Sequence, residues 1–181
     1  MVGGAELAEL DAEAADANAG EVLCLPYFLG EKSPIHDPDL RGAFAGMHLG
    51  HTRAALYRAV LEAIAFRFRH HVDVFTDIGI PMTHVDPGPP CGSRSMPMCS
   101  ASNCTPSGAH PGASLGAAVI AAIGVGALDD WADAARFVSL QPPVVPDPSR
   151  RGLYDDAYQR WRELGDVMAP ISHAIARSAR R

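Results

Sequence analysis

The residues best suited to bind a ligand are the small ones in 111–118, Pro-Gly-Ala-Ser-Leu-Gly-Ala-Ala. Small side chains at this spacing allow a sharp turn and let the start of a helix approach a ligand closely. Free backbone N–H groups at a helix N-terminus attract anions such as phosphate groups. Two closely packed helices also require Gly and Ala, so this stretch alone leaves anion binding and helix packing both open.

Two earlier segments favour the first interpretation. Residues 25–34 read Leu-Pro-Tyr-Phe-Leu-Gly-Glu-Lys-Ser-Pro, and residues 42–62 join Gly-Ala-Phe-Ala-Gly to a later Ala-Val-Leu-Glu. The three segments, in this order, resemble the C-terminal half of the FGGY carbohydrate kinases, with the xylulokinases most similar. The resemblance runs from about Val22 to about Tyr158, and it departs from the family signature at Ala55, where a polar side chain is expected.

The resemblance implies an α/β fold, the incomplete C-terminal domain of a sugar kinase of the actin-like ATPase (ribonuclease H-like) type. Complete relatives hold a sugar between two such domains and transfer the γ-phosphate of ATP, with Mg²⁺, to a sugar hydroxyl. Their catalytic aspartate lies upstream of anything matched here. We therefore expect no catalytic acid and no metal ligand in this chain, a sugar or polyol substrate in the complete enzyme, and a missing N-terminal kinase domain as partner. The chain alone is expected to be inactive.

The resemblance also implies a nucleotide site in two groups of residues. One group matches the loop that borders the nucleotide, and the other matches the segment near the adenine and ribose. A turn glycine and a surface charge are the plain alternatives for the first group. The residues are Gly92, Ser93, Arg94 and Ser95 for the loop, and Gly112, Ala113, Ser114 and Gly116 for the segment.

Periodicity and turn signals predict alternating helices and strands. Along 52–77 the apolar residues Leu56, Val60, Ile64, Phe68, Val72 and Phe75 recur at helical spacing, which predicts one long amphipathic helix capped by Thr52. The C-terminal stripe Tyr154, Tyr158, Trp161, Leu164, Met168, Ile171 and Ile175 predicts a buried helix face, which Pro170 kinks or splits. Further helices are expected at 7–17, 111–124 and 129–137, and strands at 21–25, 42–50 and 144–145.

These elements predict three parts of the chain: an acidic helical lead-in at 1–20, the kinase domain at 21–148, and a C-terminal helix at 149–181.

Charged residues outside the proposed nucleotide site are expected to be structural. Arg58 with Glu62 and Arg69 with Asp73 lie one helical turn apart and are predicted as solvated ion pairs. Residues 31 and 32 match a family loop of architectural value. The plain expectation for Glu31, Asp37 and Asp39 is a turn or surface carboxylate, and His70 and His71 are expected to be exposed and without function.

The interval 86–107 interrupts this pattern, because it contains no Leu, Ile, Val or aromatic residue and carries three of the four cysteines. One interpretation is a functional loop with Cys91, Cys99, Cys104 and His110 around a metal, although the spacing matches no familiar zinc pattern. The other is a shifted reading frame. Rereading the codons of 98–107 one base earlier forces a Val and a Leu at the positions where the family strand needs them.

Composition narrows the classes of function. The net charge of −6 disfavours a nucleic-acid partner. The N-terminus lacks the basic start and apolar run of a secretory signal, and no apolar stretch is long enough to span a bilayer, so a cytoplasmic location is expected. A non-catalytic nucleotide-binding or interaction module, and a decayed gene product, remain as alternative functions.

Overall fold

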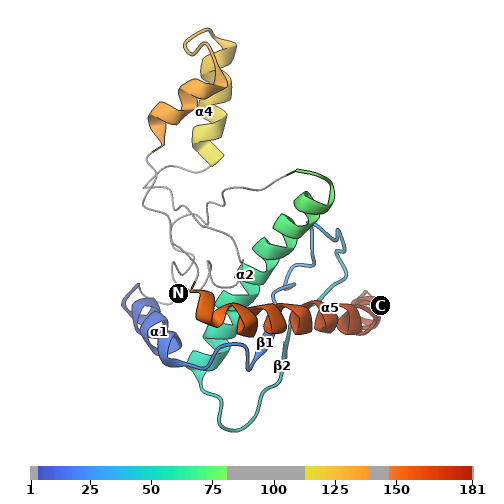
Figure 1. Ribbon diagram of the computed structural model, residues 1–181. Helices are drawn as coiled ribbons and strands as arrows, with labels where there is room; N and C mark the ends of the chain where they lie inside the picture. Colours follow the sequence, from blue (N-terminus) through green and yellow to red (C-terminus); the bar gives the residue numbers. More distant parts are fainter. Residues whose placement is uncertain (1–3, 81–112, 139–146, 181) are drawn as a thin grey trace.

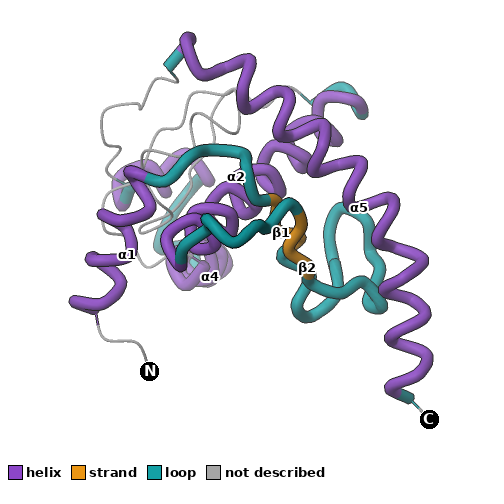
Figure 2. The backbone as a smooth tube through the Cα atoms, turned by 90° about the horizontal axis from the view of Figure 1, so that it is seen from below, coloured by secondary structure: helices purple, strands orange, loops and turns teal. Residues whose placement is uncertain are grey.

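The computed structural model describes residues 4–80, 113–138 and 147–180 (Figure 1). Helices surround a small antiparallel sheet in which β1 (Leu23–Leu25) pairs with β2 (Ala43–Ala45), with Leu23 opposite Ala45. The long helices α2 (Arg53–Asp77) and α5 (Arg151–Ala179) pack against β1, and the helix α1 (Gly4–Asp16) packs on α2 (Figure 2). The remaining described elements are α4 (Ala113–Gly124) and the 3₁₀ segments η1 (Trp131–Phe137) and η2 (Pro148–Arg150).

The boundaries expected for α2 are confirmed. Thr52 is the N-cap residue in extended conformation, and Ile78 is the C-cap. Gly79 follows with a φ of +82°, a left-handed conformation that glycine adopts without strain. The N–H of Gly79 donates to the carbonyl of Thr76 and that of Ile80 to the carbonyl of Phe75, which closes the helix end in the usual way.

The face of α2 that is most deeply buried differs from the one expected. Arg58, Glu62, Phe66 and His70 are buried, whereas the predicted stripe through Leu56, Val60, Ile64, Phe68 and Val72 is only half-buried, and Phe75 is exposed. Both long stripes repeat every four residues, so spacing alone does not distinguish them. The helix is covered on more than one side, since α1, β1 and α5 all pack against it.

Aromatic residues of α5 form the main core. Tyr154, Tyr158 and Trp161 are buried, and Phe66 of α2 packs against Trp161 with ring centroids 6.0 Å apart. The indole N–H of Trp161 donates to the carbonyl of Cys24 at 2.8 Å, which fastens α5 to β1.

The rest of the predicted α5 stripe meets two corrections. Ile171 and Ile175 are about half exposed, and the buried face continues after Met168 through Ser172 and Ala176 instead. Pro170 does not split the helix, because α5 continues through it as one element.

Other expected elements are shorter or of another type. The strand predicted over 42–50 ends at Ala45, because the φ of +83° at Gly46 is not that of an extended strand. Only glycine fits there, since a Cβ would lie 2.7 Å from the carbonyl oxygen of Glu21. The helix expected at 129–137 is the 3₁₀ segment η1, capped by reciprocal bonds between Asp130 and Asp133. The strand expected at 144–145 lies outside the described residues. In the described parts of the chain, no helix is both long and apolar enough to cross a membrane.

Candidate functional site

The predicted nucleotide segment begins α4. Ala113, Ser114 and Gly116 all lie in the first turn of this helix and are exposed, and a Cβ added to Gly116 would meet nothing within 4 Å. This turn carries no acidic side chain that would repel an anion. Gly92, Ser93, Arg94, Ser95 and Gly112 lie outside the described residues, as does the interval 86–107 with its cysteines.

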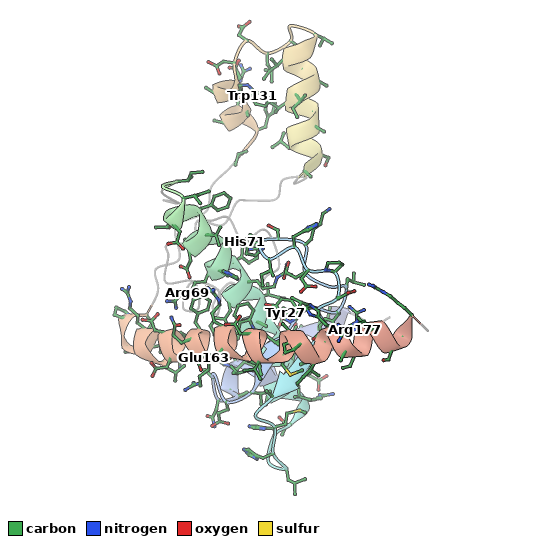
Figure 3. The ribbon with its side chains drawn as sticks, turned by 90° about the vertical axis from the view of Figure 1, so that its right-hand side faces the viewer. Tyr27, Arg69, His71, Trp131, Glu163 and Arg177 are labelled. Carbon is green, nitrogen blue, oxygen red and sulfur yellow. The ribbon has the colours of Figure 1, made fainter. Side chains whose placement is uncertain are left out.

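The helix α4 packs on η1, and Trp131 of η1 is labelled in Figure 3. Val119 is buried while Ile120 is 60% exposed, so this helix presents apolar side chains at its surface. Among the described elements, tight packing therefore does not explain the small residues at its start.

The loop that follows β1 is more ordered around its acidic residues than the sequence indicated. Two backbone hydrogen bonds between Glu31 and Asp37 close it, at 2.8 and 2.6 Å. The Glu31 side chain is only 1% exposed, and it accepts from Arg67 at 2.7 Å and from the N–H of Ser33 at 3.0 Å. The expectation is a turn or surface carboxylate. Glu31 does lie in a turn, where it accepts from the N–H of Ser33, but it is not a surface group, since its side chain is buried with its own counter-ion.

The same loop is tied to the C-terminal end of α5. His173 Nε2 donates to the Asp37 carboxylate at 2.6 Å, and Arg180 bonds the carboxylate of Asp39. Partial burial raises the pKa of Asp37, but the hydrogen bonds from His173 and from the backbone of Asp39 outweigh it, so the pKa lies below its ordinary value. These contacts make the two carboxylates anchors of the loop.

The first predicted ion pair on α2, between Arg58 and Glu62, forms but is not solvated. Arg58 Nε donates to Glu62 at 2.9 Å, and the two side chains are 8% and 2% exposed. The Arg58 guanidinium also donates to the carbonyl of Ala14 and the hydroxyl of Tyr154, while Glu62 accepts from the N–H of Gly20. The pair thus joins α1, α2 and α5 in one buried network.

The second predicted pair on α2 does not form. Arg69 instead lies 2.7 Å from Asp155 on α5, and its guanidinium covers the ring of Tyr158 at 4.3 Å. Asp73 accepts a hydrogen bond from the hydroxyl of Tyr158 at 2.6 Å. Arg69 therefore forms an ion pair with α5 and Asp73 a hydrogen bond with it, because the close contact of the two helices offers partners better placed than those on the same helix.

Beside the loop, α2 and α5 border a partly open pocket of about 100 Å³. Tyr27 of the loop, His70 of α2 and Trp161 of α5 line it, with Arg162 and Asp166 also contributing. His70 is only 8% exposed, so the expectation of an exposed residue is wrong. Its position four residues after Phe66, on the buried stripe of α2, is the signal that could have placed it inside.

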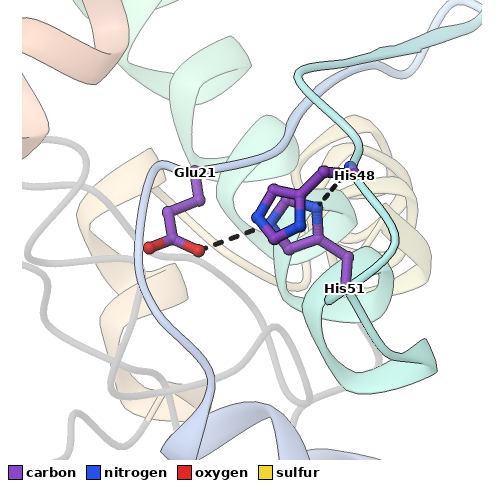
Figure 4. Close-up of side chains that lie close together, drawn as sticks. All are labelled: Glu21, His48 and His51. Atoms are coloured by element: carbon purple, nitrogen blue, oxygen red, sulfur yellow. Dashed lines mark hydrogen bonds and ion pairs between the residues drawn. The ribbon is translucent and has the colours of Figure 1, made fainter.

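Figure 4 shows a cluster of Glu21, His48 and His51 at the turn after β2. Nδ1 of His48 accepts from the N–H of Gly50, and Nδ1 of His51 accepts from the N–H of His48, each at 3.0 Å. A neutral ring with an accepting Nδ1 carries its proton on Nε2, and Nε2 of His51 faces Glu21 at 3.3 Å. Each ring nitrogen that a metal would use is thus protonated or occupied, so this cluster is a hydrogen-bonded turn.

Comparison with known proteins identifies the arrangement. Residues 3–86 match the C-terminal domain of the FGGY family of carbohydrate kinases. This stretch of the chain matches the family. The matched stretch covers α1, β1, β2 and α2, and it ends where the interval 86–107 begins.

Individual FGGY kinases match more of the chain. The crystal structure of xylulose kinase from Rhodospirillum rubrum is 38% identical and superimposes with a TM-score of 0.77, over 94% of this chain and 36% of that one. Xylulose kinase of Lactococcus lactis is 28% identical over 162 residues, 85% of this chain and 32% of that protein. Glycerol kinase of Enterococcus faecalis is 30% identical over 161 residues, 82% of this chain and 31% of that protein.

The chain spans about a third of the length of the curated relatives it matches. Its mixed α/β arrangement is a C-terminal part of the actin-like ATPase fold of the FGGY sugar kinases, as the resemblance implied. The gluconate kinase structure from Lactobacillus acidophilus, at 20% identity and a TM-score of 0.74, supports the same fold over 90% of this chain and 34% of that one.

Proposed function

We propose that this chain is the nucleotide-side, C-terminal domain of an ATP-dependent carbohydrate kinase of the xylulose kinase type. The observation that carries the proposal is the similarity to the Rhodospirillum rubrum xylulose kinase over 94% of the chain. The complete enzyme transfers the γ-phosphate of ATP to a hydroxyl group of a sugar or polyol. It acts in the cytoplasm, and an N-terminal kinase domain supplies the catalytic aspartate.

The first turn of α4 is the described part of the proposed nucleotide site. The start of a helix favours negative charge or hydrogen-bond acceptors nearby. The exposure of Ala113 and Ser114 and the open space at Gly116 support close approach of the adenine and ribose. Gly112 belongs to the same segment, and the loop Gly92, Ser93, Arg94 and Ser95 is proposed to border the nucleotide.

The metal ion of the reaction is proposed to be Mg²⁺. Since the first turn of α4 carries no carboxylate, this segment supplies no ligand for the ion. Mg²⁺ commonly binds through substrate phosphates and one or two carboxylates, so the phosphates and the partner domain are proposed to hold it. The contribution of this chain is to bind and orient the nucleotide.

An assay of phosphoryl transfer tests the proposal. The purified chain is incubated with ATP, Mg²⁺ and xylulose, gluconate or glycerol, with the intact Rhodospirillum rubrum xylulose kinase as positive control. We expect no sugar phosphate above the blank from this chain alone, because in-line transfer needs groups from both sides of the cleft. ATP-dependent formation of a sugar phosphate by the chain alone would contradict the proposal that another domain supplies the catalytic aspartate.

A further inference from the structure

The outward face of α5 carries a patch of neighbouring apolar side chains. Val167 is 65% exposed and Ile171 is 47% exposed, and Pro170 and Ala174 beside them are exposed as well. The opposite face of the helix is buried, and Figure 3 shows α5 crossing the front of the molecule. Single apolar residues are common on a surface, but a contiguous apolar patch is typical of an interaction site.

The patch lies in a seam with the spacing of helix packing. Residues 163, 167, 170, 174 and 177 are separated by alternating steps of four and three, which keeps them on one line when two helices lie along each other. The three inner positions are apolar, and the two outer ones are Glu163 and Arg177. Because α5 is a folded helix of 29 residues, it offers this seam ready for a second helix.

The two charges that end the seam are free to bind a partner. Glu163 and Arg177 are both exposed, and neither forms an ion pair or a side-chain hydrogen bond with another described residue. Arg180 on the same helix, by contrast, bonds the carboxylate of Asp39. The outward charges of the seam are therefore the ones left without a counter-ion in the described chain.

The seam is complementary to itself when the second helix is antiparallel. Glu163 lies seven residues before Pro170 and Arg177 lies seven residues after it, so each charge is about 10 Å from Pro170 along the helix axis. A two-fold axis at Pro170 brings Glu163 of each copy level with Arg177 of the other, which gives two ion pairs. The same axis sets Val167 of one copy beside Ala174 of the other. A parallel pair would instead place like charges together.

We propose that α5 pairs with α5 of a second copy of this chain, antiparallel and centred on Pro170. The inference goes beyond the proposed kinase function and does not depend on it. A few half-exposed apolar side chains bury much less than the about 800 Å² per partner of a stable interface, so we expect a dissociation constant of about 100 µM. The chain is then a single copy at the low micromolar concentrations of an optical unfolding experiment.

Sedimentation equilibrium of the full chain, from low micromolar to millimolar concentration, measures the association. We expect the mass to rise from that of one chain towards that of two. Val167→Asp puts a charge into the apolar seam and should weaken the association at least about tenfold. Ile120→Asp on α4 is the matched control, since Ile120 is 60% exposed and lies outside the seam, and it should leave the dissociation constant unchanged.

Reversing the charges tests the orientation of the two helices. Arg177→Glu sets a carboxylate level with Glu163 of the second copy and should weaken the association by about tenfold, because like charges then face each other. The double variant Glu163→Arg with Arg177→Glu restores opposite charges in both pairs. We expect it to regain the original dissociation constant to within about threefold.

Three results would overturn the proposal. They are the mass of a single chain at every concentration, an equal loss of association in Ile120→Asp and Val167→Asp, and no recovery in the double charge variant. The first would leave the face to another partner, and the second would move the contact to another surface. Circular dichroism checks that each variant is folded, and if Val167→Asp is not, the charge variants at the two exposed positions decide the question alone.

Discussion

At the scale of single residues, the buried pair of Arg58 and Glu62 carries more of the structure than its sequence spacing indicates. The same spacing of four describes a solvated pair worth a few tenths of a kcal/mol and a buried one whose disruption is costly. This pair is buried because α1 and α5 cover it, and Arg58 donates to Ala14 of α1 and Tyr154 of α5. These two partners lie 44 and 96 residues from Arg58 in the sequence. No local pattern contains that information.

Replacing Glu62 tests this network. In Glu62→Gln the side chain keeps its shape but loses its charge, which leaves the Arg58 guanidinium buried without a counter-ion. We expect the free energy of unfolding to fall by about 3 kcal/mol, as is typical when one partner of a buried pair is removed. Urea unfolding followed by circular dichroism measures it.

The exposed residue Glu163 on α5 provides the control, and Figure 3 labels it. Glu163→Gln is expected to change the free energy of unfolding by less than about 0.5 kcal/mol. Equal effects of the two substitutions would mean that Arg58 is solvated and that the buried network does not form.

At the scale of elements, local signals predicted the long helices well. The bounds of α2 follow from Thr52 at the start and Gly79 at the end, both readable from the sequence. The strand at 42–50 was predicted too long, because the sequence does not show that the carbonyl of Glu21 lies against Gly46. Nor did it show that α5 passes through Pro170 and leaves Ile171 exposed.

The proline inside α5 is a local weakness of that helix. Pro170 lacks the N–H that would bond the carbonyl of Asp166, and its ring crowds that turn. Pro170→Ala should therefore raise the free energy of unfolding by about 1–2 kcal/mol, less than the full helix-propensity difference of about 3 kcal/mol, because the unfolded chain also gains freedom. The midpoint of urea unfolding measures the change.

The matched control is Pro148→Ala at the first turn of η2, where proline is well placed. That substitution should give no gain in stability. A loss of stability in Pro170→Ala would show instead that a bend at Pro170 is needed to seat Ser172 and Ala176 in the core.

At the scale of the whole molecule, three ordered motifs predicted the family and the mixed α/β fold, and the comparisons confirm both. The order of the three motifs could predict the family because it can be read from the sequence alone. The nucleotide residues stay a prediction, since the loop at 92–95 lies outside the described residues and only the start of α4 is described. The pocket at Tyr27 and His70 could not be predicted, because it forms where three distant segments meet.

The interval 86–107 also stays a prediction at this scale. Resequencing the gene should reveal compensating frame errors around it, because the forced Val and Leu fall where the family strand needs them. Restoring the frame should return apolar side chains to the core, each worth about 1.5–3 kcal/mol when buried, and raise the thermal midpoint. A confirmed gene sequence, together with an ordered metal site at Cys91, Cys99 and Cys104, would contradict this interpretation.

Titration of the chain with ADP tests the central claim most directly. The account predicts weak saturable binding, with a dissociation constant near 1 mM or about −4 kcal/mol, because only one side of the cleft is present. Calorimetry should show this binding weakened at least tenfold in Gly116→Leu, which fills the open space at the start of α4, and unchanged in Gly124→Leu at its end. Absence of ADP binding, or binding that is equal in both variants, would contradict the assignment of this chain as the nucleotide side of the kinase.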